Sequence, residues 1–203
     1  MTRELGTQIG WEIQPKEIYV GQGADAKLIT NHKALLRDDT NDVVSIMKKT
    51  YSPMTNAEFI DTVEKIREIS DFKLTGFNEF KGGCKVLAFL ENTKGNISIG
   101  GNKIKDYMLL GNSFDGSTSF FQGTSTVLIR CQNQFSQILV QNKIRHTKGI
   151  TKKLEEFYMY LDFYFNQRDE MYRQFDRLGN VSLTEELQEQ MIKFILNVKE
   201  VSG

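Results

Sequence analysis

Proline, cysteine and histidine are scarce in this sequence, with two of each among 203 residues. So little proline leaves no room for long proline-rich linkers. The two cysteines allow one disulfide at most, and the first residues contain no apolar stretch typical of a signal peptide. We therefore expect Cys84 and Cys131 to be reduced thiols of a cytoplasmic protein.

A surplus of charge of either sign is also missing. Lysine and arginine together number 26, and so do aspartate and glutamate, which makes the formal net charge zero. This balance argues against a broad basic surface for nucleic acid. It is compatible with a local basic patch, because charge can be segregated by face. No apolar run approaches the length of a membrane span, so we expect no membrane partner.

Length and composition are those of an ordinary globular chain. Hydrophobic residues make up 39% and charged residues 26%, and the length suffices for one domain with a helical extension. The N-terminal residues are expected to pack through Trp11, Ile13 and Tyr19. We predict an N-terminal arm over residues 1–27, a core domain over 28–150, and a C-terminal helical extension over 151–203 that packs on the core or on a partner.

The core region alternates between short apolar strands and polar turns. The turns include Asp38–Asp42, Lys81–Gly83 and Asp115–Gly116, whose residue types favour tight reversals. Consecutive strands joined by short turns are typical of an antiparallel β-meander. We also predict a short helix over residues 134–142 and a last short strand over 143–147.

One helix is expected within this core. After a capping Thr55 or Asn56, apolar residues recur at spacings of three and four up to Ile69. This spacing predicts an amphipathic helix that packs on the sheet. The predicted fold class is therefore α+β: an antiparallel β-meander sheet with an amphipathic helix packed on it and a C-terminal helical pair.

The helical pair is predicted from a change of pattern at Thr151. Apolar residues then recur at helical spacing, Gly179 ends the first helix, and Thr184 caps the second. Tyr160 and Phe163 lie off the main apolar face, which predicts burial on more than one side. Simple packing on the sheet is the default interpretation, and the alternative is a partner surface, which would allow a homo-oligomer through the Phe157–Phe175 helix.

Dense groups of small and polar residues follow two of the predicted strands. They occur within Leu109–Ser119 and within Val127–Gln134. Such groups are costly to bury unless each donor and acceptor is paired, so they either build a tight turn or line a site. Together with Arg145–Thr147, the two segments are expected to form one polar surface at the end of the sheet.

The same part of the chain gathers basic residues with few acids between them. Lysine, arginine, amides and hydroxyls contact phosphate oxygens, and phenylalanine rings stack on single-stranded bases. The alternative is that the phenylalanines belong to the core and the cations to a solvated face, and both interpretations stay open. The candidate nucleic-acid-binding residues are Asn112, Ser113, Phe114, Asp115, Ser117, Phe120, Arg130, Gln132, Asn133, Lys143, Arg145, His146 and Lys148.

An enzyme acting on nucleic acid is a further hypothesis, in which Asp115, Arg130, Cys131 and His146 surround the polar surface. The motif context of thiol enzymes is missing around Cys131 and His146, and turn chemistry explains Asp38–Asp42 and Asp115. The cysteines and histidines also lack the close spacing of metal ligands. We therefore assign no catalytic residue, no metal and no cofactor.

Six short pieces of the sequence follow one another in a recognisable order. They are Leu35–Asp39, Val44–Ile46 leading to Tyr51–Phe59, Phe80–Gly83, Leu109–Ser117, Val127–Gln134 and Ile144–Thr147. In this order the chain, over roughly Leu28 to Leu161, resembles the phage/plasmid-like protein family of unknown function (domain of unknown function 932). Two departures are visible: Gln134 stands where the family usually has threonine, and the chain is shorter than many members.

The resemblance implies a mobile-element context in a bacterial host and a shared α+β core, without an assigned activity. It singles out the polar positions Asn112, Asp115, Gly116, Arg130, Cys131, Asn133, Arg145 and His146. We therefore expect a phage or plasmid protein that binds nucleic acid, with single-stranded DNA as the leading candidate. The expected role is in replication or recombination, similar to that of an annealing protein. A second, non-enzymatic alternative is an interaction protein that binds a host factor or a small ligand.

Overall fold

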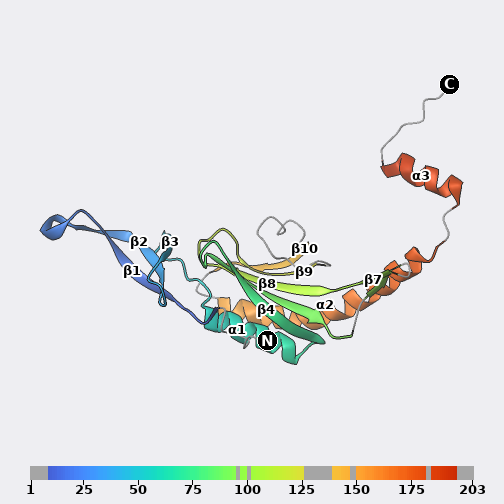
Figure 1. Cartoon of the computed structure of the whole chain (residues 1–203), viewed down its shortest axis with the longest axis horizontal. Coiled ribbons are helices and arrows are strands. Elements are labelled where there is room, and N and C mark those ends of the chain that lie inside the picture. Colours follow the sequence, from blue (N-terminus) through green and yellow to red (C-terminus); the bar gives the residue numbers. More distant parts are fainter. Residues whose placement is uncertain are drawn as a thin grey trace, which may run out of the picture.

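The computed structural model describes residues 9–94, 97–99, 102–125, 139–146, 150–181 and 184–195. Within the described residues, all the strands precede the two C-terminal helices (Figure 1). The strands are β1 (Ile13–Val20), β2 (Lys27–Arg37), β3 (Val43–Lys48), β4 (Phe72–Phe80), β5 (Lys85–Asn92), β6 (Ile97–Ile99), β7 (Asn102–Ile104), β8 (Tyr107–Ser113), β9 (Phe120–Ser125) and β10 (Leu139–Ile144). The helices are α1 (Asn56–Glu68), α2 (Ile150–Gly179) and α3 (Glu185–Ile195), with one 3₁₀ turn, η2 (Gly23–Asp25).

The larger sheet is an antiparallel meander. Its five strands lie in the order β10-β9-β8-β5-β4, and each neighbouring pair is antiparallel. The short hairpin of β6 and β7 is inserted between β5 and β8 without joining this sheet. The predicted α+β class with a β-meander is therefore confirmed.

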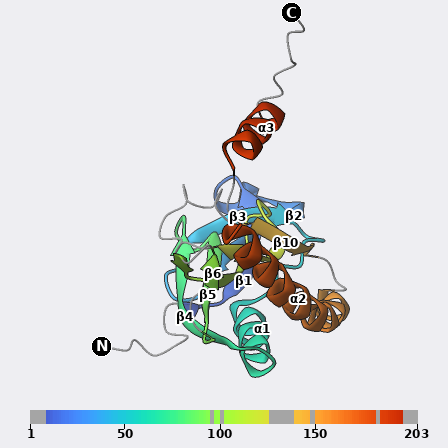
Figure 2. The same ribbon diagram turned by 90° about the vertical axis from the view of Figure 1, so that its right-hand side faces the viewer.

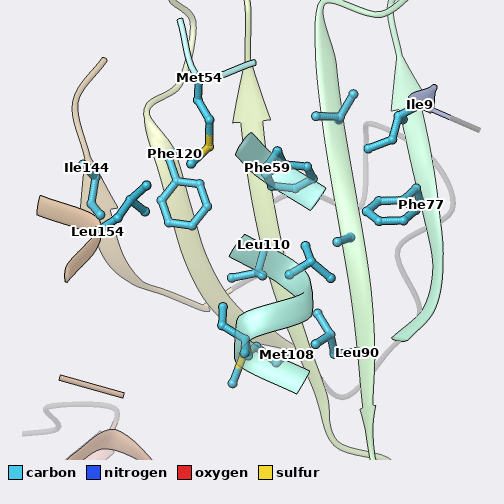
Figure 3. Close-up of a cluster of buried hydrophobic side chains, with 14 of the residues drawn as sticks. Ile9, Met54, Phe59, Phe77, Leu90, Met108, Leu110, Phe120, Ile144 and Leu154 are labelled. Carbon is cyan, nitrogen blue, oxygen red and sulfur yellow. The ribbon is translucent and has the colours of Figure 1, made fainter. Parts of the chain in front are cut away.

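Both α1 and α2 cover one face of this sheet (Figure 2). Side chains alternate between the two faces along a strand, so β8 directs Met108 and Leu110 towards the helices (Figure 3). Phe120 of β9 links the helices, because its ring contacts Phe59 of α1 and Phe157 of α2 at centroid distances of 6.3 and 5.6 Å. The predicted packing of an amphipathic helix on the sheet is what the core shows.

The opposite face of the sheet carries a second apolar cluster, formed by Leu87, Phe89, Tyr107, Leu109 and Phe121. A Cβ atom at Gly111 of β8 would lie 2.2 Å from the Phe121 ring and 2.8 Å from Leu87. Glycine at this position therefore lets the Phe121 ring lie directly across β8.

The smaller sheet, which we call the wing, consists of β1, β2 and β3 in this order. Its β1–β2 hairpin projects away from the five-stranded sheet (Figure 1). Strand β1, which lies within the predicted N-terminal arm, pairs with β2, so this hairpin extends across residue 27. Trp11 is buried and Ile13 packs against the core as expected, but Tyr19 is 56% exposed, so the prediction that it packs was wrong.

Trp11 connects the wing to the body of the molecule. Its indole Nε1 donates a hydrogen bond of 2.9 Å to Glu79 of β4, and the Arg37 guanidinium of β2 lies 4.2 Å above its ring. The ring also packs on Phe114 at 5.4 Å, and the Trp11 carbonyl accepts a hydrogen bond of 2.7 Å from the buried amide of Asn56. We call this set of contacts the Trp11 clasp.

Glu12, the next residue, caps helix α1 from outside the helix. Its carboxylate accepts hydrogen bonds from the backbone amides of Asn56 and Ala57, at 3.0 and 2.6 Å. Thr55 and Glu58 add a reciprocal capping box. The first amides of a helix lack partners within the helix and carry partial positive charge, so a residue directly before β1 stabilises the start of α1.

A buried ion pair holds α2 against the other end of the sheet. Asp106, just before β8, and Arg168 of α2 are 2% and 5% exposed, and their Oδ2 and Nη1 atoms lie 3.6 Å apart. Tyr172 and Asn92 donate hydrogen bonds to the Asp106 carboxylate, at 3.0 and 3.2 Å. Burial and the Asp106 charge raise the pKa of the Tyr172 phenol well above its ordinary value, so it stays a donor.

Two local predictions at the C-terminal side have different outcomes. The helix predicted over residues 134–142 is wrong for Leu139–Asn142, which pair with β9 as part of β10, while residues 134–138 lie outside the described residues. The C-terminal helices are as predicted, with α2 ending at Gly179 and the Thr184 hydroxyl accepting a hydrogen bond of 3.3 Å from Leu187 N–H. In the described ranges, no helix is long and apolar enough to cross a membrane.

The Glu12 cap predicts a measurable loss of stability. Glu12→Ala removes the acceptors of two α1 amides, so the free energy of unfolding should fall by about 1–2 kcal/mol, as for other lost N-caps. Urea denaturation followed by circular dichroism measures this. Glu17→Ala, which removes an exposed carboxylate of β1, is the control and should change stability by less than about 0.5 kcal/mol. Equal losses in both variants would contradict the capping role.

Candidate functional site

The end of β8 and the turn after it contain the first group of predicted site residues. Asn112 and Ser113 are the last residues of β8, and they are 1% and 0% exposed. The Asn112 side-chain amide donates a hydrogen bond of 3.0 Å to the carbonyl of Met54. Ser113 Oγ donates to the carbonyl of Thr118 and accepts from its N–H, at 2.7 and 3.1 Å. Both side chains therefore hold the turn and the segment before α1 in place.

The half-buried Asp115 and the exposed Ser117 form the outer part of this turn. The Asp115 carboxylate accepts a hydrogen bond of 2.9 Å from the Ser117 N–H, and Gly116 has a φ of 68°. Burial alone would raise the pKa of Asp115, but hydrogen bonds from Ser117 and the charge of Lys85 outweigh it and lower that pKa. The Asp-Gly turn is as predicted, and its carboxylate is ionised at neutral pH.

The wing supports this turn from the other side. Ser45 of β3 donates a hydrogen bond of 2.7 Å from its hydroxyl to the carbonyl of Phe114. A Cβ atom at Gly116 would lie 2.9 Å from the end of the Met47 side chain, also on β3. Glycine is therefore favoured at position 116 for two reasons: the positive φ of the turn and the close approach of β3.

His146 joins the same region from the far end of β10. Its Nδ1 accepts a hydrogen bond of 3.3 Å from Met54 N–H, and its ring meets that of Tyr51 edge-on at 5.6 Å. The Tyr51 hydroxyl donates a 3.0 Å hydrogen bond to the carbonyl of Ser113. We call Tyr51, Met54, Asn112, Ser113 and His146 the polar cluster.

The protonation states in the polar cluster follow from burial. Burial lowers the pKa of His146, so the imidazole is neutral at pH 7, and its hydrogen bond from Met54 places the proton on Nε2. Burial and the charge of Asp115 raise the pKa of Tyr51 to about 12, so the phenol keeps its proton. The cluster is therefore an uncharged hydrogen-bonding group next to an ionised aspartate.

Three buried atoms around the polar cluster find no hydrogen-bond partner within the described residues: Asn112 Oδ1, Thr118 Oγ1 and His146 Nε2. Buried polar atoms are ordinarily paired, so these are the positions where a further polar contact is expected. Cys84, on the preceding strand connection, donates from its thiol to the carbonyl of Val44 at 3.3 Å, and burial raises its pKa. It is therefore a thiol rather than an activated nucleophile.

Phe114 and Phe120 are core residues. Both are 0% exposed, Phe114 against Trp11 and Phe120 between the two helices that cover the sheet. The prediction that these rings stack on bases is corrected here, because a ring without exposed surface offers no face to a base. The alternative interpretation of the sequence, that they belong to the core, is the one the structure supports.

The basic candidates separate from the polar cluster. Lys143 and Arg145 are exposed, whereas Ile144 between them is buried and His146 is half-buried. Alternation along β10 therefore directs Lys143 away from the face on which Ile144 lies, and Arg145, directly after β10, is exposed as well. The predicted union of His146 with Asn112 and Ser113 is present, but Lys143 and Arg145 do not share it. Arg130, Gln132, Asn133 and Lys148, together with Cys131, lie outside the described residues.

The sequence prediction did not include Tyr51, Met54 and the Trp11 clasp. In the sequence, Tyr51 and Met54 belong only to the Tyr51–Phe59 piece of the family resemblance, because their contacts to His146 span more than ninety positions. Among the residues that the structure describes, no three His, Cys, Asp or Glu side chains are grouped so that they could hold a metal ion. What the arrangement offers chemically is hydrogen bonding to a polar group.

The pKa of His146 predicts a pH-dependent contribution to stability. Because the pKa in the folded state is lower than the ordinary value of about 6.5, the unfolded state binds more protons below that pH. Stability from the neutral imidazole is thus complete above pH 6.5 and is lost as the pH falls through the pKa of the folded state.

Urea denaturation between pH 5 and 8 measures this loss. We expect His146→Gln to lose less stability on acidification than the wild type, whereas His32→Gln, on the wing, should follow the wild type. An unchanged pH dependence in His146→Gln would contradict a buried neutral His146.

Comparison with known proteins places the chain in a family. The model described as "Domain of unknown function (DUF932)" matches residues 43–202, from β3 through α3 and beyond. The match includes the whole polar cluster and leaves out Trp11 and Glu12. No curated protein and no solved structure matches the chain. Because the family model covers most of the chain, the protein belongs to the DUF932 family.

Proposed function

We propose that the protein binds single-stranded DNA, and that the wing supplies much of the binding surface. A role in phage or plasmid replication or recombination belongs to the same proposal and rests on the resemblance of the sequence. The observation that carries the proposal is the distribution of cations that have no acidic partner. Such cations are the groups that contact phosphates.

The wing is rich in unpaired lysines. Its three strands contain Lys16, Lys27, Lys33 and Lys48, against a single acidic residue, Glu17. None of the four lysines forms an ion pair with another described residue, and Lys49 directly after β3 is unpaired in the same sense. The strands of the wing therefore carry more cations than acids, whereas its turns add Asp25, Asp38, Asp39 and Asp42, so residues 13–48 hold five cations and five acidic residues.

Cations in the rest of the molecule are more often neutralised. Lys65 pairs with Asp61, Lys94 with Asp71 and Lys105 with Glu91, at 2.8, 2.6 and 2.9 Å, while Arg168 is buried beside Asp106. Arg37, at the base of the wing, is bound by Asp39 and Glu79. Unpaired cations therefore make up a larger share of the cations on the wing than in the rest of the described residues, and such cations are what a phosphate-binding surface requires.

An exposed aromatic ring lies near the tip of the wing. Tyr19 of β1 is 56% exposed and pairs in register with Leu28 of β2. Its hydroxyl donates to Glu17 at 2.9 Å, which holds the ring beside the strand. Proteins that bind single strands combine a basic track with such aromatic faces. This combination favours a single strand over a duplex, whose bases are already stacked. Lys143 and Arg145 are exposed cations that extend the same proposal to the edge of the five-stranded sheet.

The lysines can be tested with a charge-matched pair of variants. For single strands the logarithm of the binding constant falls with the logarithm of salt with a slope of about 0.7 per phosphate contact. Lys16→Gln with Lys48→Gln should therefore reduce the magnitude of this slope by about 1.4. Lys73→Gln with Lys81→Gln removes the same charge from exposed residues of the body and should leave the slope unchanged. Fluorescence anisotropy with a labelled oligonucleotide measures both.

The possible outcomes distinguish an error about the binding surface from an error about nucleic-acid binding itself. If both double variants reduce the slope equally, the wing is not the preferred surface. If the wild type fails to bind the oligonucleotide at low salt, where electrostatic attraction is greatest, the proposal of nucleic-acid binding is wrong, and the interaction-protein alternative is favoured. Tighter binding to duplex than to single strand would overturn the choice of substrate.

The stacking role of Tyr19 gives a separate prediction. Loss of one base–aromatic contact costs about 1–3 kcal/mol, so Tyr19→Ala should raise the dissociation constant by about fivefold or more. Val20→Ala, which truncates an exposed neighbour without a ring, should bind as the wild type does. The salt slope should be the same in both variants, because neither changes the charge. Equal affinities of the two variants would exclude stacking on Tyr19.

A further inference from the structure

Helix α2 exposes a row of large apolar side chains that no described part of the chain covers. We call Tyr160, Phe163, Met171, Phe175 and Leu178 the α2 stripe. These residues are 38%, 58%, 38%, 42% and 67% exposed. Another set of α2 side chains, including Leu154, Phe157 and Leu161, is buried against the sheet. The stripe is therefore an additional apolar surface beside the one that the core uses.

The α2 stripe occupies one side of the helix. At about 100° of rotation per residue, its five members fall within an arc of about 120°. Between Tyr160 and Leu178, the other residues in this arc are Tyr164, Gln167 and Gln174. No residue of the arc over this length carries a charge, so two copies of the surface can meet without repulsion between like charges.

The spacing of the α2 stripe is symmetric along the helix. Tyr160 and Leu178 lie nine residues before and after Asp169, and Phe163 and Phe175 lie six residues before and after it. In two antiparallel helices related by a two-fold axis near Asp169, Tyr160 and Leu178 of the two copies face one another, because they lie at the same angle around the helix. Phe163 and Phe175 lie at opposite edges of the arc and flank this contact at the same level. An interface between identical copies needs this property, because residue i must contact residue j while j contacts i.

The exposed area is of the size that an interface centre needs. An aromatic side chain covers roughly 150–250 Å², so the α2 stripe exposes on the order of several hundred Å² of apolar surface. Monomeric proteins rarely leave contiguous patches larger than a few hundred Å² in water. A stable interface buries about 800 Å² per partner, which the stripe together with polar residues on either side of it would supply. The aromatic residues are also of the type that dominates binding energy.

We propose that two copies of the chain associate through the α2 stripe, with their α2 helices antiparallel about a two-fold axis near Asp169. The uncharged arc and the symmetric spacing favour a second copy of the chain over a lipid surface as the partner of the α2 stripe. A helix that lies on a membrane ordinarily has a lysine- and arginine-rich polar face, whereas acidic residues such as Asp169 and Glu170 lie on the polar side of α2. The association does not depend on whether the protein binds DNA.

Charge placed within the stripe tests the association. Phe163→Glu should raise the dimer dissociation constant by more than about tenfold, as for an interface hot spot, measured by sedimentation equilibrium of the full chain. Val20→Glu adds the same charge at a side chain of similar exposure, 60%, on the wing, and should remain dimeric. Circular dichroism verifies that both variants are folded. A wild type that is monomeric at 100 μM, or a Phe163→Glu variant that dimerises equally well, would overturn the proposal.

Cysteine cross-linking tests the antiparallel orientation, in a background in which Cys84 and Cys131 are replaced by serine. A variant with Tyr160→Cys alone should not cross-link to itself, because the two thiols would be about 27 Å apart along the helices, too far for a disulfide. A mixture with a variant that carries Leu178→Cys should give the mixed disulfide under mild oxidation. Self-cross-linking of Tyr160→Cys would indicate parallel helices and would contradict the two-fold arrangement.

Discussion

The Trp11 clasp is the contact on which the arrangement of the other elements depends. One indole lies against the wing through Arg37, against β4 through Glu79 and against the turn after β8 through Phe114. The following carboxylate, Glu12, binds the first amides of α1. A short stretch before β1 thus sets both the attachment of the wing and the start of the helix that covers the core. The segment that leads into α1 contains Tyr51 and Met54, so the polar cluster depends on the same contacts.

The polar residues near the end of β8 divide into two groups with different uses. Asn112, Ser113 and His146 point inward and satisfy backbone groups of neighbouring segments, which explains why a dense polar sequence follows a buried strand. Lys143 and Arg145 point outward and remain exposed. At the other end of the sheet, Asp106 and Arg168 are buried together and hold α2 in place. Many polar side chains of the five-stranded sheet and its helices therefore have a structural role. The unpaired lysines of the wing have no such structural contact among the described residues.

The wing and the end of α2 lie at opposite ends of the molecule (Figure 1). An association through α2 would therefore leave both wings accessible. Two linked binding surfaces raise the apparent affinity for a long strand without new contacts, because the second binding event becomes intramolecular. In this arrangement a surface of modest local charge suffices, which agrees with a chain of zero net charge.

The sequence by itself determined the features that are encoded within a few residues. The helix cap at Thr55 or Asn56, the Asp115–Gly116 turn, the end of α2 at Gly179 and the meander of alternating strands each follow from hydrogen bonds or periodicity over short distances. Only the tertiary structure decided which aromatic rings are covered. Phe114 and Phe120 are buried by Trp11, α1 and α2, while Tyr19 meets no covering element. The tertiary structure also decided that residues 139–142, which were expected to be helical, form part of β10. Pairing with β9 outweighs the local helical preference of these residues. Burial depends on contacts with residues far away in the chain, and the local sequence pattern does not specify which residues these are.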